Sequence, residues 1–369
     1  MDMRIEVQRS DFRQALAVPD PDAASARVLE PGQARLHVAM FALTANNVTY
    51  AAFGDAMKYW QFFPSAAPQR GVVPVWGFGE VVESRAEGLV VGERVYGFFP
   101  MGSHLVVEPG RVGGDGFVDL APHRVELPAI YNRYQRSGAG GPDLEARQAL
   151  LQPLFATAFL IDDFLAGERF FGAKQVVFSS ASSKTAWCTA FCLALRPAAE
   201  RPRIVGLTST RHVGSTSALG CYDDVLAYDG LDALEAAATT VYVDMAGDAG
   251  LRQRIHRRWG DRLAHSAAVG GTHWTTLGGA AALPGPRPVL FFAPSQAARR
   301  AAPAPEGWGP DGLRDRMAAA WLRIGQWLDA RADGGLKVDL AHGVQASLDA
   351  WGRLVAGQVG PELGLIRSI

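Results

Sequence analysis

Short apolar runs separated by glycine and proline fill the first third of the chain. They include Ala34 to Met40, Val72 to Val82, Glu93 to Phe99 and His104 to Glu108. Valine-rich runs of this length, bounded by turn residues, predict β-strands. We therefore expect residues 1 to about 125 to form a β-rich, barrel-like domain.

From about residue 175 to 295, short apolar runs alternate with helical stretches. Alternation of this kind predicts a parallel sheet with helices on both faces. A helix over Leu150 to Phe164 is expected to connect the two regions. The predicted strands are Gln175 to Phe178, Arg203 to Leu207, Asp224 to Leu226, Thr240 to Val243, Arg262 to Ser266 and Val289 to Phe292.

Some segments depart from these patterns. Residues 131–147 are polar and rich in glycine, which we interpret as a substrate lid or an oligomer contact. Residues 297–310 are rich in alanine, proline and glycine and predict a disordered or lid-like loop.

Composition narrows the class of protein. The chain has 369 residues, of which 48% are hydrophobic and 20% charged, so it has room for two domains with ordinary cores. A formal net charge of −1, with acids and bases interspersed, argues against nucleic acid and against an anionic membrane surface. The N-terminus lacks the apolar region of a signal peptide. We expect a cytoplasmic protein that acts on a small molecule.

The cysteines do not predict a disulfide framework or a metal site. Cys188 and Cys192 lie four residues apart among Ala, Phe and Leu, and Cys221 stands alone. A zinc site needs about four ligands, and no other ligands lie near these cysteines in the sequence. We interpret all three as small buried hydrophobic residues and predict no metal.

The segment Gln175 to Leu195 carries the strongest functional signal, because it predicts a buried strand, a polar loop and a helix. That order directs the amides and positive dipole end of a helix toward a phosphate-bearing cofactor. The usual glycines are absent. Instead the predicted cofactor-binding residues of the loop are Ser180, Ser182, Ser183, Lys184 and Thr185. Either these hydroxyls and the lysine replace the lost backbone contacts, or the loop no longer binds a dinucleotide.

The residues after the next predicted strand bear on the kind of dinucleotide. NAD-binding units usually have an acidic residue there, whereas this chain has Thr208, Ser209, Thr210 and Arg211. Ser209 and Arg211 suit a 2′-phosphate, since a guanidinium offers paired donors to phosphate oxygens, and NADP(H) is favoured over NAD. The alternative is that Ser209 or Thr210 caps the next helix and Arg211 lies in solvent.

Several segments, taken in order, resemble the medium-chain dehydrogenase/reductase superfamily, in particular its zinc-free quinone-reductase and enoyl-reductase branches. They are LTANNVTYAAFGD, GFGEVVES with VGERVYGFF, LGCYDDVLAYDG, and the tail GLKVDLAHGVQASLDAWGRLVAGQVGPELGLI. The resemblance implies an α/β fold with a GroES-like β-barrel catalytic domain and a Rossmann-type, doubly wound parallel sheet. The expected domains are 1–150 with 325–369, and 151–324. It also implies a homodimer.

The resemblance also implies a reaction and the residues that would carry it out. In these reductases a hydride passes from the nicotinamide to an activated C=C or a quinone, while a donor stabilises the developing enolate. Asn47, Tyr50 and Tyr59 are the candidate catalytic residues, because a phenol can donate a proton to an enolate oxygen. Both tyrosines could equally be ordinary core aromatics. Gly270 and Gly271 follow a predicted strand and are expected beside the nicotinamide, and Phe292, which ends the last predicted strand, is expected to line the same pocket.

The sequence thus predicts a zinc-independent, NADPH-dependent reductase of a conjugated carbonyl compound or a quinone. The altered loop leaves other classes open, since a fold does not determine its function. One is a hydrolase or lyase on a dehydrogenase-like fold, and the other is a non-catalytic binding protein.

Overall fold

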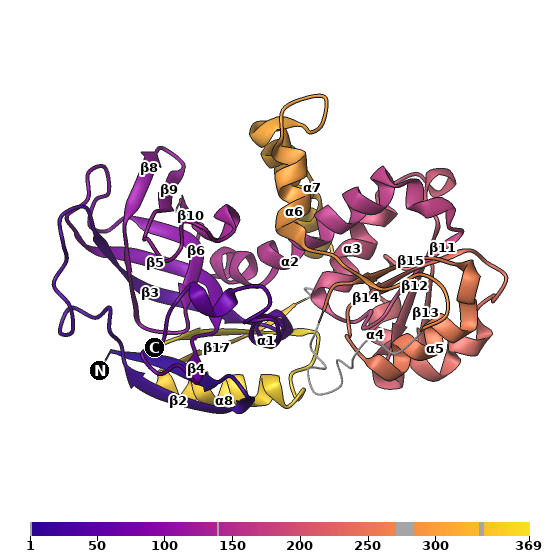
Figure 1. The fold of residues 1–369 in the computed structure, drawn as a ribbon, viewed down its shortest axis with the longest axis horizontal. Coiled ribbons are helices and arrows are strands. Elements are labelled where there is room, and N and C mark those ends of the chain that lie inside the picture. Colours follow the sequence, from indigo (N-terminus) through magenta and orange to yellow (C-terminus); the bar gives the residue numbers. More distant parts are fainter. Residues whose placement is uncertain (1, 139, 271–282, 332–335) are drawn as a thin grey trace. The chain divides into compact units, whose positions relative to one another are not determined.

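The computed structural model describes residues 2–138, 140–270, 283–331 and 336–369. The chain divides into unit 1, Met1–Gln152 with Leu336–Ile369, and unit 2, Pro153–Gly335. Figure 1 follows the chain through both units from indigo to yellow. The return to unit 1 comes at Leu336 rather than at residue 325, because helix α7 (Gly309–Asp329) runs through that position.

Unit 1 is built mainly on antiparallel strands. Its helical elements are α1 Ala45–Ala52, η1 Tyr59–Gln61, η2 Ala129–Tyr131 and α8 Val344–Val355. Its strands are β1 Met3–Gln8, β2 Asp11–Pro19, β3 Ala34–Leu43, β4 Arg70–Gly71, β5 Pro74–Ser84, β6 Arg94–Pro100, β7 His104–Val107, β8 Pro109–Gly113, β9 Gly116–Asp119, β10 Arg133–Arg136, β17 Lys337–His342 and β18 Leu363–Ser368. The larger sheet has the order β17-β18-β3-β5-β6-β10-β9-β8, with β7 paired to β3, and the smaller sheet has the order β2-β1-β4.

Unit 2 is built on a parallel sheet. Its strands are β11 Gln175–Phe178, β12 Arg203–Thr208, β13 Asp224–Ala227, β14 Thr240–Asp244, β15 Leu263–Ala268 and β16 Val289–Leu290. They pair in the order β13-β12-β11-β14-β15-β16, so the order reverses between β11 and β14. In such sheets ligands bind outside the carboxyl ends of the strands, at this reversal.

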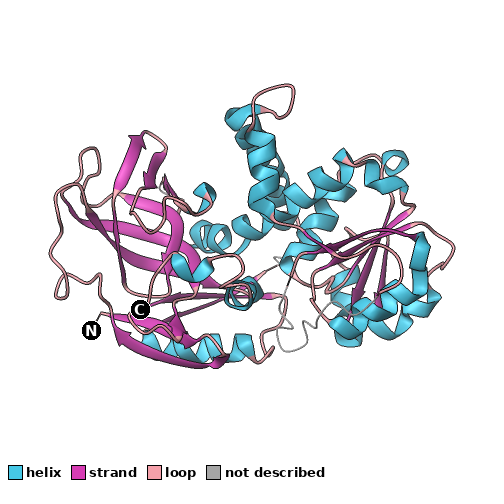
Figure 2. Ribbon diagram, viewed as in Figure 1, coloured by secondary structure: helices cyan, strands magenta, loops and turns pink. Residues whose placement is uncertain are grey.

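Helices lie on both sides of the sheet of unit 2 (Figure 2). Leu251, Ile255 and Trp259 of one helix pack with Val177, Val205 and Tyr242 of the strands in a buried cluster. The helical elements, of which the first begins in unit 1, are α2 Pro142–Gly167, η3 Arg169–Gly172, α3 Lys184–Ala194, η4 Ala198–Glu200, η5 Thr210–His212, α4 Val213–Ser217, η6 Tyr228–Ala233, α5 Ala249–Trp259, η7 Gly260–Arg262, α6 Ala293–Ala301 and α7 Gly309–Asp329.

Helix α2 is long and apolar enough to cross a membrane by length and composition alone. Its apolar window is 61% buried inside the structure. Two successive carboxylates near its end are held by arginines of unit 2, Asp162 by Arg196 and Asp163 by Arg300, each at 2.7 Å. Packing in the protein core therefore accounts for the apolar composition of α2.

The interpretation of residues 131–147 as a lid is wrong. Strand β10 pairs with β6 and β9, and Tyr134 is fully buried between exposed Arg133 and Gln135. The polar residues are the outward-facing half of a strand, since successive side chains point to opposite faces. Residues 297–310 also differ from the predicted loop, because α6 continues to Ala301 and α7 begins at Gly309.

A buried arginine holds together the end of unit 1 that carries β9 and β10. Arg124 has no exposed surface. Its guanidinium donates to Asp119 Oδ2 at 2.8 Å, Asn132 Oδ1 at 3.1 Å, the Tyr134 hydroxyl at 2.9 Å and the Tyr131 carbonyl at 2.8 Å. Asp119 is 1% exposed, so this is a fully desolvated ion pair whose remaining donors and acceptors are satisfied.

We predict that Arg124→Met destabilises unit 1. Removing one partner leaves the Asp119 carboxylate buried without its counter-charge, which costs about 3–5 kcal/mol. Calorimetry would register this as a lower unfolding temperature. Arg314→Met, which breaks an exposed ion pair with Asp311, is the matched control and should leave the transition in place. Equal transitions for the two variants would contradict a structural role for Arg124.

Candidate functional site

Ser179 and Asp244 stand on either side of the point where the strand order of unit 2 reverses. Ser179 follows β11 and Asp244 ends β14, and both are buried. The Ser179 hydroxyl donates to Asp244 Oδ1 at 2.9 Å and accepts from the amides of Met245 and Ala246 at 2.9 and 3.1 Å. Arg252 Nε donates to Asp244 Oδ2 at 2.9 Å. Side chains thus bridge the ends of β11 and β14.

The loop after β11 turns sharply without glycine. Ser180 adopts φ 48°, a left-handed conformation that favours glycine, and its amide donates to the Tyr228 hydroxyl at 3.1 Å. The next residue, Ala181, lies against Gly206 of β12. A Cβ at Gly206 would come within 2.7 Å of the Ala181 Cβ. The close approach that a glycine in the loop usually allows is therefore provided by a glycine on the neighbouring strand.

The predicted phosphate-binding residues lie together at the beginning of α3. Ser183 precedes the helix and Lys184 is its first residue, with 9% of its surface exposed. The Thr208 hydroxyl at the end of β12 donates to the Ser182 hydroxyl at 3.1 Å. The Ser183 hydroxyl is buried and has no hydrogen-bond partner within the described part of the chain. A partnerless hydroxyl at the positive end of a helix suits an anionic oxygen.

The residues expected beside a 2′-phosphate follow β12 directly. The Ser209 hydroxyl is buried and, over the residues that the structure describes, without a partner. Arg211 lies on η5 and is exposed, with its Nε 3.1 Å from His212 Nε2. Ser209 does not cap the following helical element with its side chain, which removes the capping alternative for this residue.

The residues expected beside the nicotinamide lie at the same edge of the sheet, farther along it. Gly270 follows β15, and its amide donates to the Asp244 carbonyl at 3.1 Å. A Cβ at Gly270 would lie 2.0 Å from the Met245 carbonyl oxygen, so only glycine fits there. Phe292 follows β16 and precedes α6. Gly271 lies outside the described residues.

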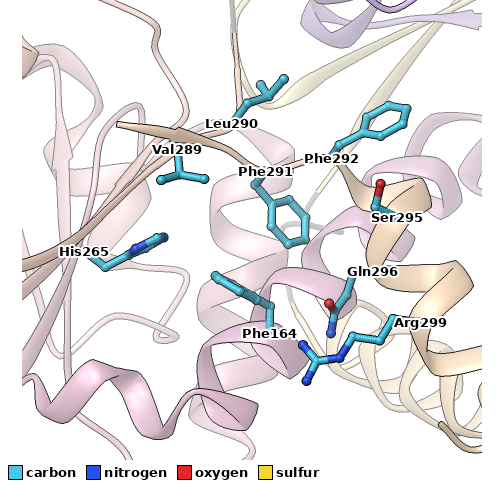
Figure 3. A pocket seen from close by; sticks show the side chains of 9 residues that line it. All are labelled: Phe164, His265, Val289, Leu290, Phe291, Phe292, Ser295, Gln296 and Arg299. Carbon is cyan, nitrogen blue, oxygen red and sulfur yellow. The ribbon is translucent and has the colours of Figure 1, made fainter. Parts of the chain in front are cut away.

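A half-open cavity of about 250 Å³ lies beside β16 in unit 2. Figure 3 shows Phe291 pointing into it, toward Phe164 of α2, while Phe292 points away from Phe291. His265 of β15 lines the opposite wall, stacked on Phe171 with ring centroids 4.2 Å apart. The cavity is mostly apolar, with Arg299 as its cation.

Tyr50 and Tyr59 lie in one buried aromatic cluster of unit 1, with ring centroids 4.6 Å apart. The Tyr50 hydroxyl accepts a hydrogen bond from the Trp76 indole nitrogen at 3.1 Å. The Tyr59 hydroxyl lies 3.1 Å from the Tyr131 hydroxyl. Burial raises the pKa of Tyr59 to about 12, although the hydrogen bond with Tyr131 lowers it, and burial also raises the pKa of Tyr50. All three phenols are therefore protonated at neutral pH.

Both the oxygen and the nitrogen of the Asn47 side-chain amide form hydrogen bonds within the protein. Its Oδ1 accepts from the Thr44 amide at 2.7 Å, and its Nδ2 donates to the Pro74 carbonyl at 2.9 Å. The first contact belongs to a capping box at the beginning of α1. Asn47 therefore joins α1 to β5 and holds the helix on which Tyr50 lies.

Sequence reasoning missed Asp244, Tyr131 and Gly206. Asp244 is the polar residue that ends the buried run Thr240 to Val243, a pattern that could have marked it. Tyr131 was assigned to a surface segment, and no local pattern reveals its contact with Tyr59. The cysteines are buried, as predicted. Among the described residues, no three of His, Cys, Asp or Glu lie together as possible metal ligands.

Comparison with known proteins agrees with this architecture. The model of the family described as "Protein of unknown function (DUF2855)" matches residues 41–360. No curated protein matches the chain by sequence. Among solved structures, CurA from Vibrio vulnificus in complex with NADPH is 12% identical with a TM-score of 0.59, covering 99% of this chain and 98% of that one.

Two further solved structures are similar at comparable levels. The yhdH oxidoreductase from Salmonella enterica in complex with NADP is 15% identical, with a TM-score of 0.52 over the full length of both chains. A quinone oxidoreductase from Pseudomonas syringae is 13% identical, with a TM-score of 0.55, covering 99% of this chain and 100% of that one. At such identities the similarity shows the fold, and the predicted pair of a GroES-like and a Rossmann-type unit is confirmed.

We predict that Asp244→Ala destabilises unit 2 by about 3–5 kcal/mol, because Arg252, whose side chain is 15% exposed, would lose this carboxylate and the buried Ser179 hydroxyl would lose its acceptor. Unfolding followed by calorimetry would show the change. Asp261→Ala, at an exposed position of the same unit, should leave the unfolding temperature unchanged. A small effect at Asp244 would mean that the bridge between β11 and β14 contributes little.

Proposed function

The chain belongs to the DUF2855 family, and we propose that it is a cytoplasmic, zinc-independent, NADPH-dependent reductase. Its substrate would be a compound with an activated C=C next to a carbonyl, or a quinone. The observation that carries the proposal is the pair of buried hydroxyls of Ser183, which precedes α3, and Ser209, which follows β12; neither has a hydrogen-bond partner among the described residues. Such hydroxyls are expected where phosphate oxygens accept hydrogen bonds.

The residues at the beginning of α3 suit a pyrophosphate. Ser182, Ser183 and Thr185 offer hydroxyl donors, and Ser180 shapes the turn that brings them together. Lys184 would balance the phosphate charge next to the helix dipole. In the proposal these residues together replace the glycine-rich loop, whose contacts come from backbone amides alone.

A 2′-phosphate would be held by Ser209 and Arg211. Arg211 is exposed at the end of β12, where a guanidinium can turn toward a phosphate, and no carboxylate follows that strand to bind ribose hydroxyls. These features support NADPH over NADH. The solved NADPH and NADP complexes of similar fold lend support to the same cofactor.

NADPH, when bound, supplies a hydride. Gly270 and Phe292 would border the ring that carries it, Gly270 because it lacks a side chain at a point of close backbone approach. In the proposal Tyr59 gives its proton to the carbonyl oxygen as negative charge develops there, and the resulting phenolate regains a proton from water. Tyr50 shapes the aromatic wall, and Asn47 positions Tyr50 through α1.

The purified protein should bind NADPH more tightly than NADH. Loss of a hydrogen bond to a charged group weakens binding by about tenfold or more. Ser183→Ala, Lys184→Ala and Arg211→Ala should therefore each lower the affinity for NADPH by that factor. Only Arg211→Ala should leave NADH binding unchanged, because NADH has no 2′-phosphate. Fluorescence of the reduced cofactor measures each affinity.

Arg314→Ala is the control for that titration, since Arg314 lies on α7 and pairs with Asp311. It should bind NADPH as the unmodified protein does. Failure to bind either cofactor would overturn the reductase proposal. Equal loss of NADH and NADPH affinity in Arg211→Ala would overturn the 2′-phosphate assignment alone.

With NADPH present, the protein should reduce members of a panel of enones and quinones, and Tyr59→Phe should lower kcat by about 100-fold or more for enones. Loss of the reduced cofactor's absorbance follows the reaction. Quinone reduction should depend less on Tyr59, because a quinone accepts a hydride without needing a proton in the same step. Tight NADPH binding with no turnover of any compound would instead favour a binding protein.

A further inference from the structure

The Tyr59 and Tyr131 hydroxyls form a pair inside the aromatic cluster of unit 1. Their oxygens lie 3.1 Å apart, and the bond is buried. Tyr59 begins η1, and Tyr131 ends η2, so the pair joins two short helical turns that lie far apart in the sequence. A phenol that accepts one hydrogen bond keeps its own proton for another acceptor.

We propose that Tyr131 is a positioning residue for Tyr59, whose hydroxyl it fixes by donating a hydrogen bond to the Tyr59 oxygen. The inference rests on the proposed function, in which Tyr59 gives up its proton. As the Tyr59 O–H bond breaks and the substrate oxygen gains the proton, negative charge remains on the Tyr59 oxygen. The Tyr131 O–H then points at that charge, and such charge-assisted bonds are stronger than neutral ones.

Burial keeps both phenols of the pair protonated. Burial raises the pKa of Tyr131 well above its usual value, and the neighbouring phenols Tyr59 and Tyr50 raise it further. Burial raises the pKa of Tyr59 only to about 12, and the bond with Tyr131 acts to lower it. In the proposed function Tyr59 gives its proton to the substrate, so the proton that lies between the two oxygens is that of Tyr131.

The ring of Tyr131 is held on several sides. Its centroid lies 4.7 Å from that of Phe98 and 5.3 Å from that of Phe62. Arg124 holds the backbone of Tyr131 by donating to its carbonyl oxygen at 2.8 Å. Because the ring and the backbone are both held, little besides the hydroxyl proton is left to adjust, which is what a positioning residue requires.

The cluster supplies its own control. Tyr96 stacks on Trp76 with centroids 5.5 Å apart, and its hydroxyl is buried with no hydrogen-bond partner in the described part of the chain. Tyr96→Phe removes the same atom as Tyr131→Phe, from the same cluster, without removing a hydrogen bond. An effect of Tyr131→Phe that Tyr96→Phe lacks therefore reports on the bond with Tyr59.

The test compares Tyr59→Phe, Tyr131→Phe, the double variant and Tyr96→Phe in the full chain with NADPH and an enone that the unmodified protein reduces. Tyr131→Phe should lower kcat by about tenfold and leave KM unchanged, since it removes one hydrogen bond that strengthens as charge develops. The double variant should be no slower than Tyr59→Phe, because Tyr131 acts only through Tyr59. Tyr96→Phe should match the unmodified protein.

A second readout does not depend on activity. In protein labelled with carbon-13 at tyrosine Cζ, the Tyr59 resonance should move in Tyr131→Phe and stay in place in Tyr96→Phe. An unmoved resonance overturns the hydrogen bond. A moved resonance with unchanged kcat, or additive losses in the double variant, overturns the positioning role.

An unmodified protein that reduces no enone overturns the proposed function, and with it the catalytic use of the pair. The NMR comparison still decides whether the hydrogen bond exists. Failure of the positioning role and failure of the proposed function are thus told apart.

Discussion

The buried carboxylate of Asp244 is the interaction on which the candidate cofactor edge depends. It is 1% exposed and accepts hydrogen bonds from Ser179, the Gly247 amide and Arg252. Its main-chain carbonyl accepts from the amides of Val269 and Gly270. One residue therefore joins the ends of β11, β14 and β15 with α5. A charge buried this deeply is stable only when it is paired and hydrogen-bonded, as Asp244 is by these three donors.

The unusual loop after β11 follows from that network. Because side chains bridge the strand ends, the loop needs no run of glycines to bring backbone amides together. Ser180 adopts the left-handed conformation, and its amide is hydrogen-bonded to the Tyr228 hydroxyl. Gly206 on the neighbouring strand has no side chain and so leaves room for Ala181. The tight turn is thus made by Ser180 within the loop together with Tyr228 and Gly206 outside it. Two buried hydroxyls, those of Ser183 and Ser209, have no hydrogen-bond partner among the residues that the structure describes.

In unit 1, buried phenol hydroxyls are likewise held by hydrogen bonds from distant residues. Trp76 satisfies the Tyr50 hydroxyl, Tyr131 satisfies that of Tyr59, and Arg124 binds the backbone of Tyr131. Burial keeps these phenols protonated at neutral pH, which is the state a proton donor needs. An apolar aromatic environment alone would give rigidity. The hydrogen bonds also fix the position of each hydroxyl oxygen, which the proposed proton donor requires.

Local patterns in the sequence were sufficient for the fold class and for most strands. The run Gln175 to Phe178 is β11 residue for residue, because a parallel strand that is buried on both faces is mostly apolar, as Val176, Val177 and Phe178 are here. The altered loop, its hydroxyls and Lys184 could also be located, since they follow that strand directly. Only the tertiary structure decided the contacts between segments far apart in the chain: Ser179 with Asp244, Ala181 with Gly206, and Tyr59 with Tyr131. Periodicity in the sequence indicates which face of an element is buried, but not which distant side chain packs against that face. For this reason the polar residues 131–147 suggested a lid, and only the pairing of β10 with β6 and β9 placed Tyr134 in the core.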